Sequence, residues 1–328
     1  MTQHGYANFP RGMRWAALGL LGLCLFVIWD QVHWWLTRDD YSFGFIVPFF
    51  VGYVLYERWP TLQRTLREGG LAAEVGHGNH GWMPPMVTAG AWLFLAAGML
   101  LFLFGALYRA AEGTSPTASM PIALGFAVIT LAVVYLACDT DVEGRTMFPG
   151  RRMALTMTFL FPAAIWLLSA PTFGFVERAV ATALLDKVAF VVYHGFDVFG
   201  FPLVREGSVL ILPRGEVGVE DACSGIRSMT ACLFAGSFLG AVFLDRFWKK
   251  ALLVGCALVL AFVTNLMRSL FLTIWAYRHG ADAIDGFIHD ATGYAIIGVT
   301  VVGLLLLLPI FQFKLEIDPE PQDRSNAV

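Results

Sequence analysis

The chain has 328 residues, of which 57% are hydrophobic and only 14% are charged. This balance is typical of a protein whose solvent is lipid, and it argues against a soluble globular domain. The formal net charge of −3 is too small to indicate a charged partner, and we expect no nucleic-acid ligand.

Eight apolar stretches predict an all-α polytopic membrane protein. A membrane-spanning helix needs about 20 mostly apolar residues, and seven stretches meet that length, while an eighth, at 43–57, is shorter. The predicted spans are 13–36, 43–57, 86–108, 119–138, 153–171, 222–244, 250–277 and 287–313. No small-residue cleavage site closes the first stretch, so we expect no cleavable signal peptide. We expect one membrane-embedded domain over 1–328, with its core at about 13–313 and a short tail at 314–328.

Basic residues predict the orientation of these spans. If Arg11 and Arg14 are cytoplasmic, most of the other arginines and lysines also fall in segments on the cytoplasmic side. Such an excess marks cytoplasmic loops. Both termini are therefore predicted to lie in the cytoplasm, and the long segment 172–221 is predicted to lie on the outer side of the membrane.

The segment 172–221 contains two regions with different sequence patterns. Residues 173–200 have helical periodicity with charges among apolar residues, which predicts a small interfacial helix and leaves a ninth span open. Residues 202–220, "PLVREGSVLILPRGEVGVE", alternate and contain two Gly turns, which predicts a β-hairpin-like flap. This flap leads directly to the span at 222–244.

The five cysteines show no metal-binding or redox pattern. None forms a Cys-x-x-Cys pair, so zinc, iron–sulfur and vicinal dithiol chemistry are not favoured, and we expect no cofactor and no metal. Four of the five lie within apolar runs and are expected to act as small buried hydrophobic residues, namely Cys24, Cys138, Cys232 and Cys256.

Cys223 differs because it falls at the start of the span 222–244. A helix N-terminus carries partial positive charge and free N–H groups, which favour a thiolate. Arg227 lies one turn further on and adds charge on the same face, while Ser224 and Gly225 keep the approach small. The Glu-Asp pair just before Ala222 opposes this effect. From these residues alone, both a nucleophile and a small residue at a helix start stay open.

The next span contains a charge in an apolar stretch. Arg268 lies in "AFVTNLMRSLFLTIWAYRHG", with Asn265 one turn earlier on the same face. An ionisable residue inside a span usually faces a partner or a watery cavity. A structural arginine that reaches the interface or pairs with an acid is the alternative.

The last span places a histidine at its outer end. His289 is followed by Asp290, and an imidazole there has the chemistry of a general acid or base, although an interfacial histidine is often only solvated. The predicted topology brings Cys223, Arg268 and His289 to the same face of the membrane. A thiol, an imidazole and a fixed cation are the parts of an acyl-transfer site.

These motifs carry a family resemblance. The stretches "ACSGIRSM", "TNLMRSLFLT" and "IHDATG" occur in that order across 222–293 and resemble the exosortase/archaeosortase family of membrane cysteine transpeptidases. Residues 40–59, "DYSFGFIVPFFVGYVLYERW", resemble an early segment of that family, and the likeness covers most of 30–310. Phe43 stands where many relatives have histidine, so no chemistry is assigned to that segment.

The resemblance implies a processing enzyme for exported proteins. Such substrates end in a short motif, a hydrophobic span and a basic cluster. Cys223 would attack the peptide, with His289 and Arg268 assisting, and the acyl-enzyme would pass to water, to an acceptor amine or to a glycolipid. The protein would act in the inner membrane, in contact with the lipid bilayer.

Two other functions remain open from the residues. In a protein of polysaccharide export, Arg227, Arg268 and His289 would bind a polyprenyl phosphate or another glycolipid phosphate, and the cysteine would be incidental. In a transporter, Asn265 and Arg268 would line the substrate path, but neither a repeat nor a pair of interrupted helices is evident.

Overall fold

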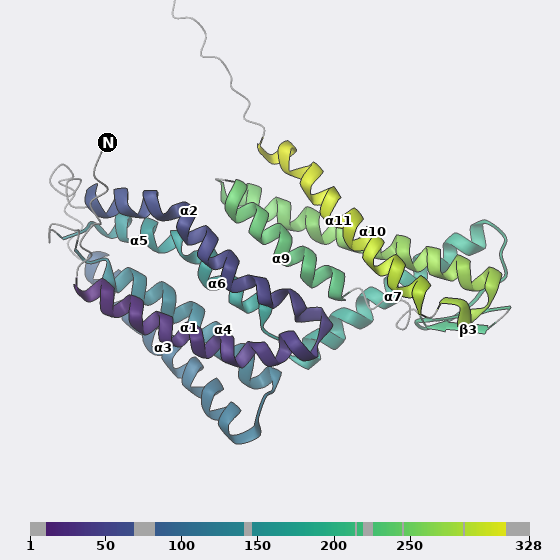
Figure 1. Ribbon diagram of the computed structural model, residues 1–328, viewed down its shortest axis with the longest axis horizontal. Coiled ribbons are helices and arrows are strands. Elements are labelled where there is room, and N and C mark those ends of the chain that lie inside the picture. Colours follow the sequence, from purple (N-terminus) through teal and green to yellow (C-terminus); the bar gives the residue numbers. More distant parts are fainter. Residues whose placement is uncertain are drawn as a thin grey trace, which may run out of the picture.

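The computed structural model is an elongated group of helices with a small sheet at one end (Figure 1). It describes residues 11–68, 83–140, 146–213, 215–218, 226–244, 246–284 and 286–312. The helices are α1 (Arg11–Thr37), α2 (Val47–Glu68), α3 (Met83–Glu112), α4 (Pro116–Ala137), α5 (Pro149–Thr158), α6 (Leu160–Ser169), α7 (Gly174–Val198), α9 (Ile226–Phe243), α10 (Phe247–His279) and α11 (Phe287–Gln312), with 3-10 helices η1 (Asp39–Ile46) and η3 (Ala281–Ile284). The strands are β1 (Val204–Glu206), β2 (Val209–Leu212) and β3 (Gly215–Gly218). The predicted all-α class is confirmed for the described chain.

Six of the eight predicted spans are helices long and apolar enough to cross a membrane. Within the described residues these are α1, α3, α4, the continuous α5–α6 pair, α10 and α11. The other two do not form membrane-length apolar helices within the described residues. The predicted span 43–57 divides between η1 and the first half of α2, whose second half is polar. For the predicted span 222–244, residues 222–225 lie outside the described residues, and the described apolar helix Ser228–Phe243 is shorter than a typical span.

Arg58 is one of several charged residues in the polar second half of α2. Its guanidinium donates hydrogen bonds to the carbonyl oxygens of Thr158, at 2.6 Å, and Ala241, at 2.9 Å. These carbonyls lie at the C-terminal ends of α5 and α9, where a helix leaves acceptors unsatisfied and carries partial negative charge. One cation therefore joins α2 to two other helices.

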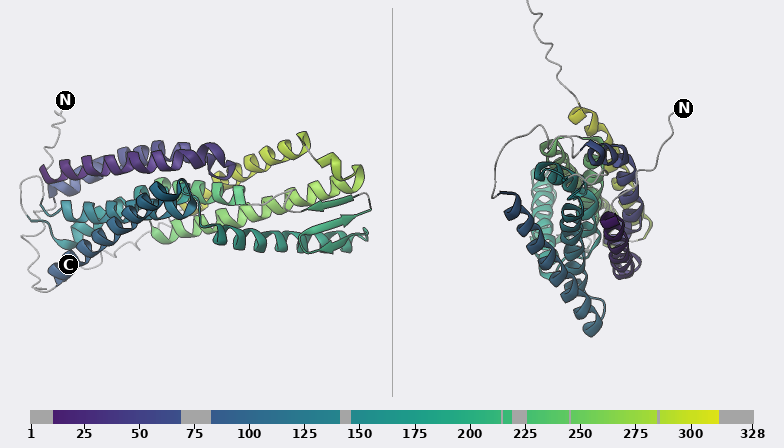
Figure 2. Two further views of the ribbon diagram at one scale, coloured as in Figure 1. Left: turned by 90° about the horizontal axis from the view of Figure 1, so that it is seen from below. Right: turned by 90° about the vertical axis from the view of Figure 1, so that its left-hand side faces the viewer.

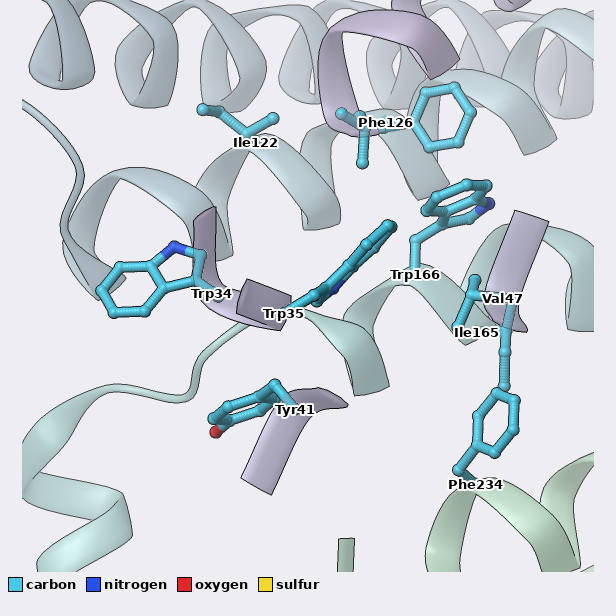
Figure 3. Close-up of a cluster of buried hydrophobic side chains, with 10 residues drawn as sticks. Trp34, Trp35, Tyr41, Val47, Ile122, Phe126, Ile165, Trp166 and Phe234 are labelled. Atoms are coloured by element: carbon cyan, nitrogen blue, oxygen red, sulfur yellow. The ribbon is translucent and has the colours of Figure 1, made fainter. Parts of the chain in front are cut away.

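A tryptophan-rich core joins α1, α4 and α6 (Figure 3). Buried polar groups cross this core. Gln31 donates to the carbonyl oxygen of Trp166 at 3.1 Å and accepts from the Ser169 hydroxyl at 2.6 Å. The Trp35 indole donates to the Ser169 carbonyl at 3.1 Å. In a low-dielectric interior such satisfied bonds fix the relative position of the helices.

Glycines bring α3 and α4 into close contact. A Cβ atom on Gly105 would lie 2.6 Å from the Ala118 carbonyl oxygen, and one on Gly125 would lie 2.6 Å from the Phe102 backbone nitrogen. Small residues at such crossings let helix backbones approach closely in a membrane. Apart from this crossing, most of α3 is exposed: only 6% of its most apolar stretch is buried within the protein.

A second compact region, the distal lobe, consists of α7, the three strands, η3 and the second half of α10. It extends beyond the other helices in both views (Figures 1 and 2). Leu185 and Val192 of α7 and Leu210 of β2 form one buried cluster, against which Leu266 and Leu270 of α10 pack. The sheet is antiparallel in the order β1-β2-β3.

The distal lobe confirms and extends what the sequence predicts for 172–221. The helix expected at 173–200 is α7, which has 25 residues and is therefore not small; it is not among the six membrane-length spans. The expected hairpin is β1–β2, with its turn at Gly207, where φ is +61°. A third strand, β3, was not predicted. Arg38, just after α1, pairs with Glu177 in the first turn of α7, and this carboxylate raises the pKa of the guanidinium.

Candidate active site

The three motif-bearing helices pack against one another. α10 contacts both α9 and α11, and α9 also contacts α11 (Figure 1). The start of α11 lies beside the second half of α10 and packs, through Ile288, against the cluster that contains Leu212 and Leu272 in the distal lobe. Residues that are distant in the sequence are thereby brought together in this lobe.

Arg268 of α10 contacts His289 of α11. The Arg268 Nη2 atom lies 3.1 Å from His289 Nε2 and donates to the His289 carbonyl oxygen at 3.2 Å. Both residues are half-buried. Two of the three residues expected to carry the chemistry are therefore in direct contact.

This contact places an N–H donor of Arg268 against one ring nitrogen of His289. A guanidinium only donates hydrogen bonds, so Nε2 is the acceptor in this contact. In this arrangement Nε2 is occupied by Arg268.

Thr292 and Gly293, which had no predicted role, lie against the Arg268–His289 pair. Thr292 Oγ1 donates to the His289 carbonyl oxygen at 2.9 Å, so this oxygen accepts from both Arg268 and Thr292. Gly293 lies one turn after His289, and a Cβ atom there would be 3.4 Å from Arg268 Nη2. The guanidinium therefore lies against the α11 backbone. The "DATG" stretch that follows His289 in the motif is the feature of the sequence that could have indicated Thr292 and Gly293.

Asn265 and Asp290, the two supporting residues predicted on these helices, differ in their burial. Asn265 is 5% exposed and lies one turn before Arg268 on α10. Asp290 is exposed, and its backbone N–H donates to the Gly286 carbonyl oxygen at 3.1 Å. It makes no ion pair within the described residues. A carboxylate in the first turn of α11 is favourable for the helix dipole, which is the role that its position indicates.

Cys223, Ser224 and Gly225 lie outside the described residues. Arg227 is part of α9, but its side chain also lies outside what the structure describes. Cys223 comes three residues before Ile226, the first residue of α9. Its role therefore stays a prediction, and the structure brings together Arg268 and His289 only.

The early motif segment packs against α9. Thr230, in the second turn of α9, donates from its hydroxyl to the Asp40 carbonyl oxygen at 3.1 Å. The ring of Phe43 lies 4.9 Å from that of Phe234 between centroids. Phe43 therefore has a packing role beside the helix that follows Cys223.

The remaining four cysteines are free thiols on helices or at a helix end. Cys138 and Cys232 are buried, and Cys24 and Cys256 are half-buried. Cys232 packs in a cluster with Ala257, Ala261 and Leu304. Such surroundings fit small hydrophobic residues rather than reactive thiols.

Comparison with known families agrees with the motifs. The model of the transmembrane exosortase family, Exosortase_EpsH, matches residues 34–306, which include the whole of α2 to α10 and most of α11. No curated protein and no solved structure gives a significant match. The family match covers most of the chain and contains every motif discussed above, so the protein belongs to the transmembrane exosortase family.

Proposed function

We propose that this protein is a membrane-embedded cysteine peptidase or transpeptidase that cleaves C-terminal sorting tails from exported proteins. Family membership implies a membrane protein that processes sorting signals. The assignment of Cys223 as nucleophile, His289 as proton carrier and Arg268 as oxyanion donor is our proposal. The observation that carries it is the 3.1 Å contact between Arg268 and His289.

This contact supports a resting arrangement that substrate opens. In the resting enzyme, Arg268 occupies Nε2 of His289. When the scissile carbonyl oxygen binds Arg268, the guanidinium turns from Nε2 toward that oxygen. Nε2 is then free to accept the Cys223 proton. Binding of the carbonyl and activation of the thiol are coupled in this way.

The bond changes follow from these roles. The Cys223 proton moves to His289 Nε2, and the sulfur attacks the carbonyl carbon while Arg268 holds the oxyanion. The C–N bond then breaks, and the imidazolium returns its proton to the leaving amine of the tail. The thioester is released by water or by an acceptor amine, whose proton His289 takes in turn.

We further propose eight membrane crossings with both termini in the cytoplasm. α2 with η1 and α9 would add two crossings to the six long apolar helices. The distal lobe then lies on the outer face, together with Arg268 and His289. This placement is supported by the bias of basic residues and puts the site where a tail anchored in the membrane presents its motif.

The test is tail release from a co-expressed exported protein that carries a tripartite C-terminal tail. Cys223→Ala should abolish release, and Cys256→Ala is the matched control because Cys256 is a half-buried thiol on α10. If Cys223→Ala releases the tail at the wild-type rate, Cys223 is not the nucleophile. If the wild-type protein itself releases no tail, the phosphate-binding or transport role is favoured instead.

A further inference from the structure

An open cavity of about 320 Å³ lies between α1 and the last turns of α3. Phe26 and Trp29 of α1 form one wall, and the wall from α3 contains Ala106, Arg109 and Ala110. The turn between α3 and α4 lines the cavity with Gly113 and Thr114. The cavity thus has apolar walls and one cation.

Arg109 is held in place from two sides. Its Nη1 atom donates to Asp30, a fully buried carboxylate of α1, and its guanidinium lies 4.2 Å from the centre of the Trp29 ring. The Arg109 side chain is 12% exposed. Within the described residues, Nη1 makes the one hydrogen bond of this side chain, so its other N–H donors are available at the cavity wall.

The position of Arg109 indicates a lipid headgroup rather than a soluble ligand. It lies in the last turn of a membrane-length helix, three residues before Glu112, at the depth of the interface. Trp29 is 60% exposed beside it, as is typical of aromatic residues at a membrane surface. On the side towards the middle of the membrane, Phe26 packs against Phe102 with ring centroids 5.4 Å apart.

We propose that this cavity binds one glycerophospholipid, with its phosphodiester on Arg109 and the start of its acyl chains along Phe26. Arginine binds phosphate oxygens through paired N–H donors, and these charge-assisted bonds are strong where water is excluded. The lipid would fill the space between α1 and α3, which are joined here by the Arg109–Asp30 pair. It would attach α3, most of whose surface is exposed, more firmly to the bundle.

The probes are dioleoyl phosphatidylethanolamine, dioleoylglycerol, which has the same chains without the phosphate, and the water-soluble glycerophosphoethanolamine. Purified, delipidated protein is mixed with each probe, and bound molecules are counted by native mass spectrometry. The phospholipid should bind at least tenfold more tightly than dioleoylglycerol, and glycerophosphoethanolamine should not displace it. Equal binding of the two lipids would overturn the role of the phosphate. Displacement by the soluble compound would mean a site for free phosphate esters.

Two variants at exposed alanines of α3 locate the site. Ala110→Phe fills the cavity and leaves the Arg109–Asp30 pair intact, so it should lower phospholipid binding at least tenfold in folded protein. Ala97→Phe adds the same ring more than three turns away on α3 and should change nothing. Arg109→Ala should also lose the lipid, but it leaves Asp30 buried without its cation and is informative only where it folds. Wild-type binding by Ala110→Phe would refute the site.

Discussion

Replacement of Arg268 separates its charge from its geometry. Arg268 Nη2 makes two contacts with His289, one to the ring and one to the carbonyl oxygen. In the proposed mechanism the same guanidinium holds the oxyanion. Loss of one good oxyanion donor costs about 2.7–4 kcal/mol, or about 10²–10³ in rate. Arg268→Gln should therefore lower tail release by about that factor.

Lysine keeps the charge but not the planar fork. Arg268→Lys should lower release by about tenfold or more, and less than Arg268→Gln, because a single ammonium cannot reproduce both contacts. Both changes should leave the protein folded in the membrane, although lost hydrogen bonds to a charged group cost about 1.5–3 kcal/mol of stability. Rates must therefore be compared at equal amounts of folded enzyme.

The assay is the initial rate of tail release in membranes that contain co-expressed substrate. Arg278→Gln is the matched control, because Arg278 is an exposed arginine ten residues further along α10. It should release tails at the wild-type rate. Wild-type rates from Arg268→Gln would remove this arginine from the mechanism and leave it a structural role.

Other predictions test the remaining parts of the site. His289→Ala should reduce release as strongly as Cys223→Ala, because the thiol loses its base and the leaving amine its proton donor; a mild effect would contradict the proton-carrier role. Gly293→Ala should stay active, since the added Cβ would lie at an ordinary 3.4 Å from Arg268 Nη2, whereas Gly293→Leu should displace the guanidinium and slow release without unfolding the protein. Cys232→Ala should keep wild-type release and lose about 1–3 kcal/mol of stability, measured by thermal unfolding. A reporter enzyme fused at residue 210 should be active outside the cell, and one fused at the C-terminus should not; outside activity at the C-terminus would refute the topology.

Hydrophobic length correctly predicted six of the eight spans as membrane-length helices, because a membrane crossing needs little more than an apolar run. It did not predict the form of 43–57, where the first residues are η1 and the apolar stretch continues into the polar end of α2. For the span 222–244, the structure describes the helix only from Ile226, so its full length is not tested. Strand β3 was not predicted as a separate strand, because Gly215–Gly218 is short and contains one apolar residue, Val217, within the stretch that was assigned to a hairpin-like flap.

The candidate site shows what motifs in one sequence can indicate. They placed Arg268 and His289 on one face of the membrane, and the structure brings them into contact. They did not indicate which atoms of the two side chains meet. That information depends on how α10 and α11 turn about their axes, which Thr292 and Gly293 help to determine.

The pair of Arg109 and Asp30 could not be predicted from the sequence. The two residues are 79 positions apart, and neither belongs to a motif. A charge inside a span requires a partner, but one sequence does not name it. The two arginines therefore differ in how they are recognised. Arg268 is found from the pattern around it, whereas Arg109 is found only from packing, by the carboxylate it pairs with and the cavity it lines.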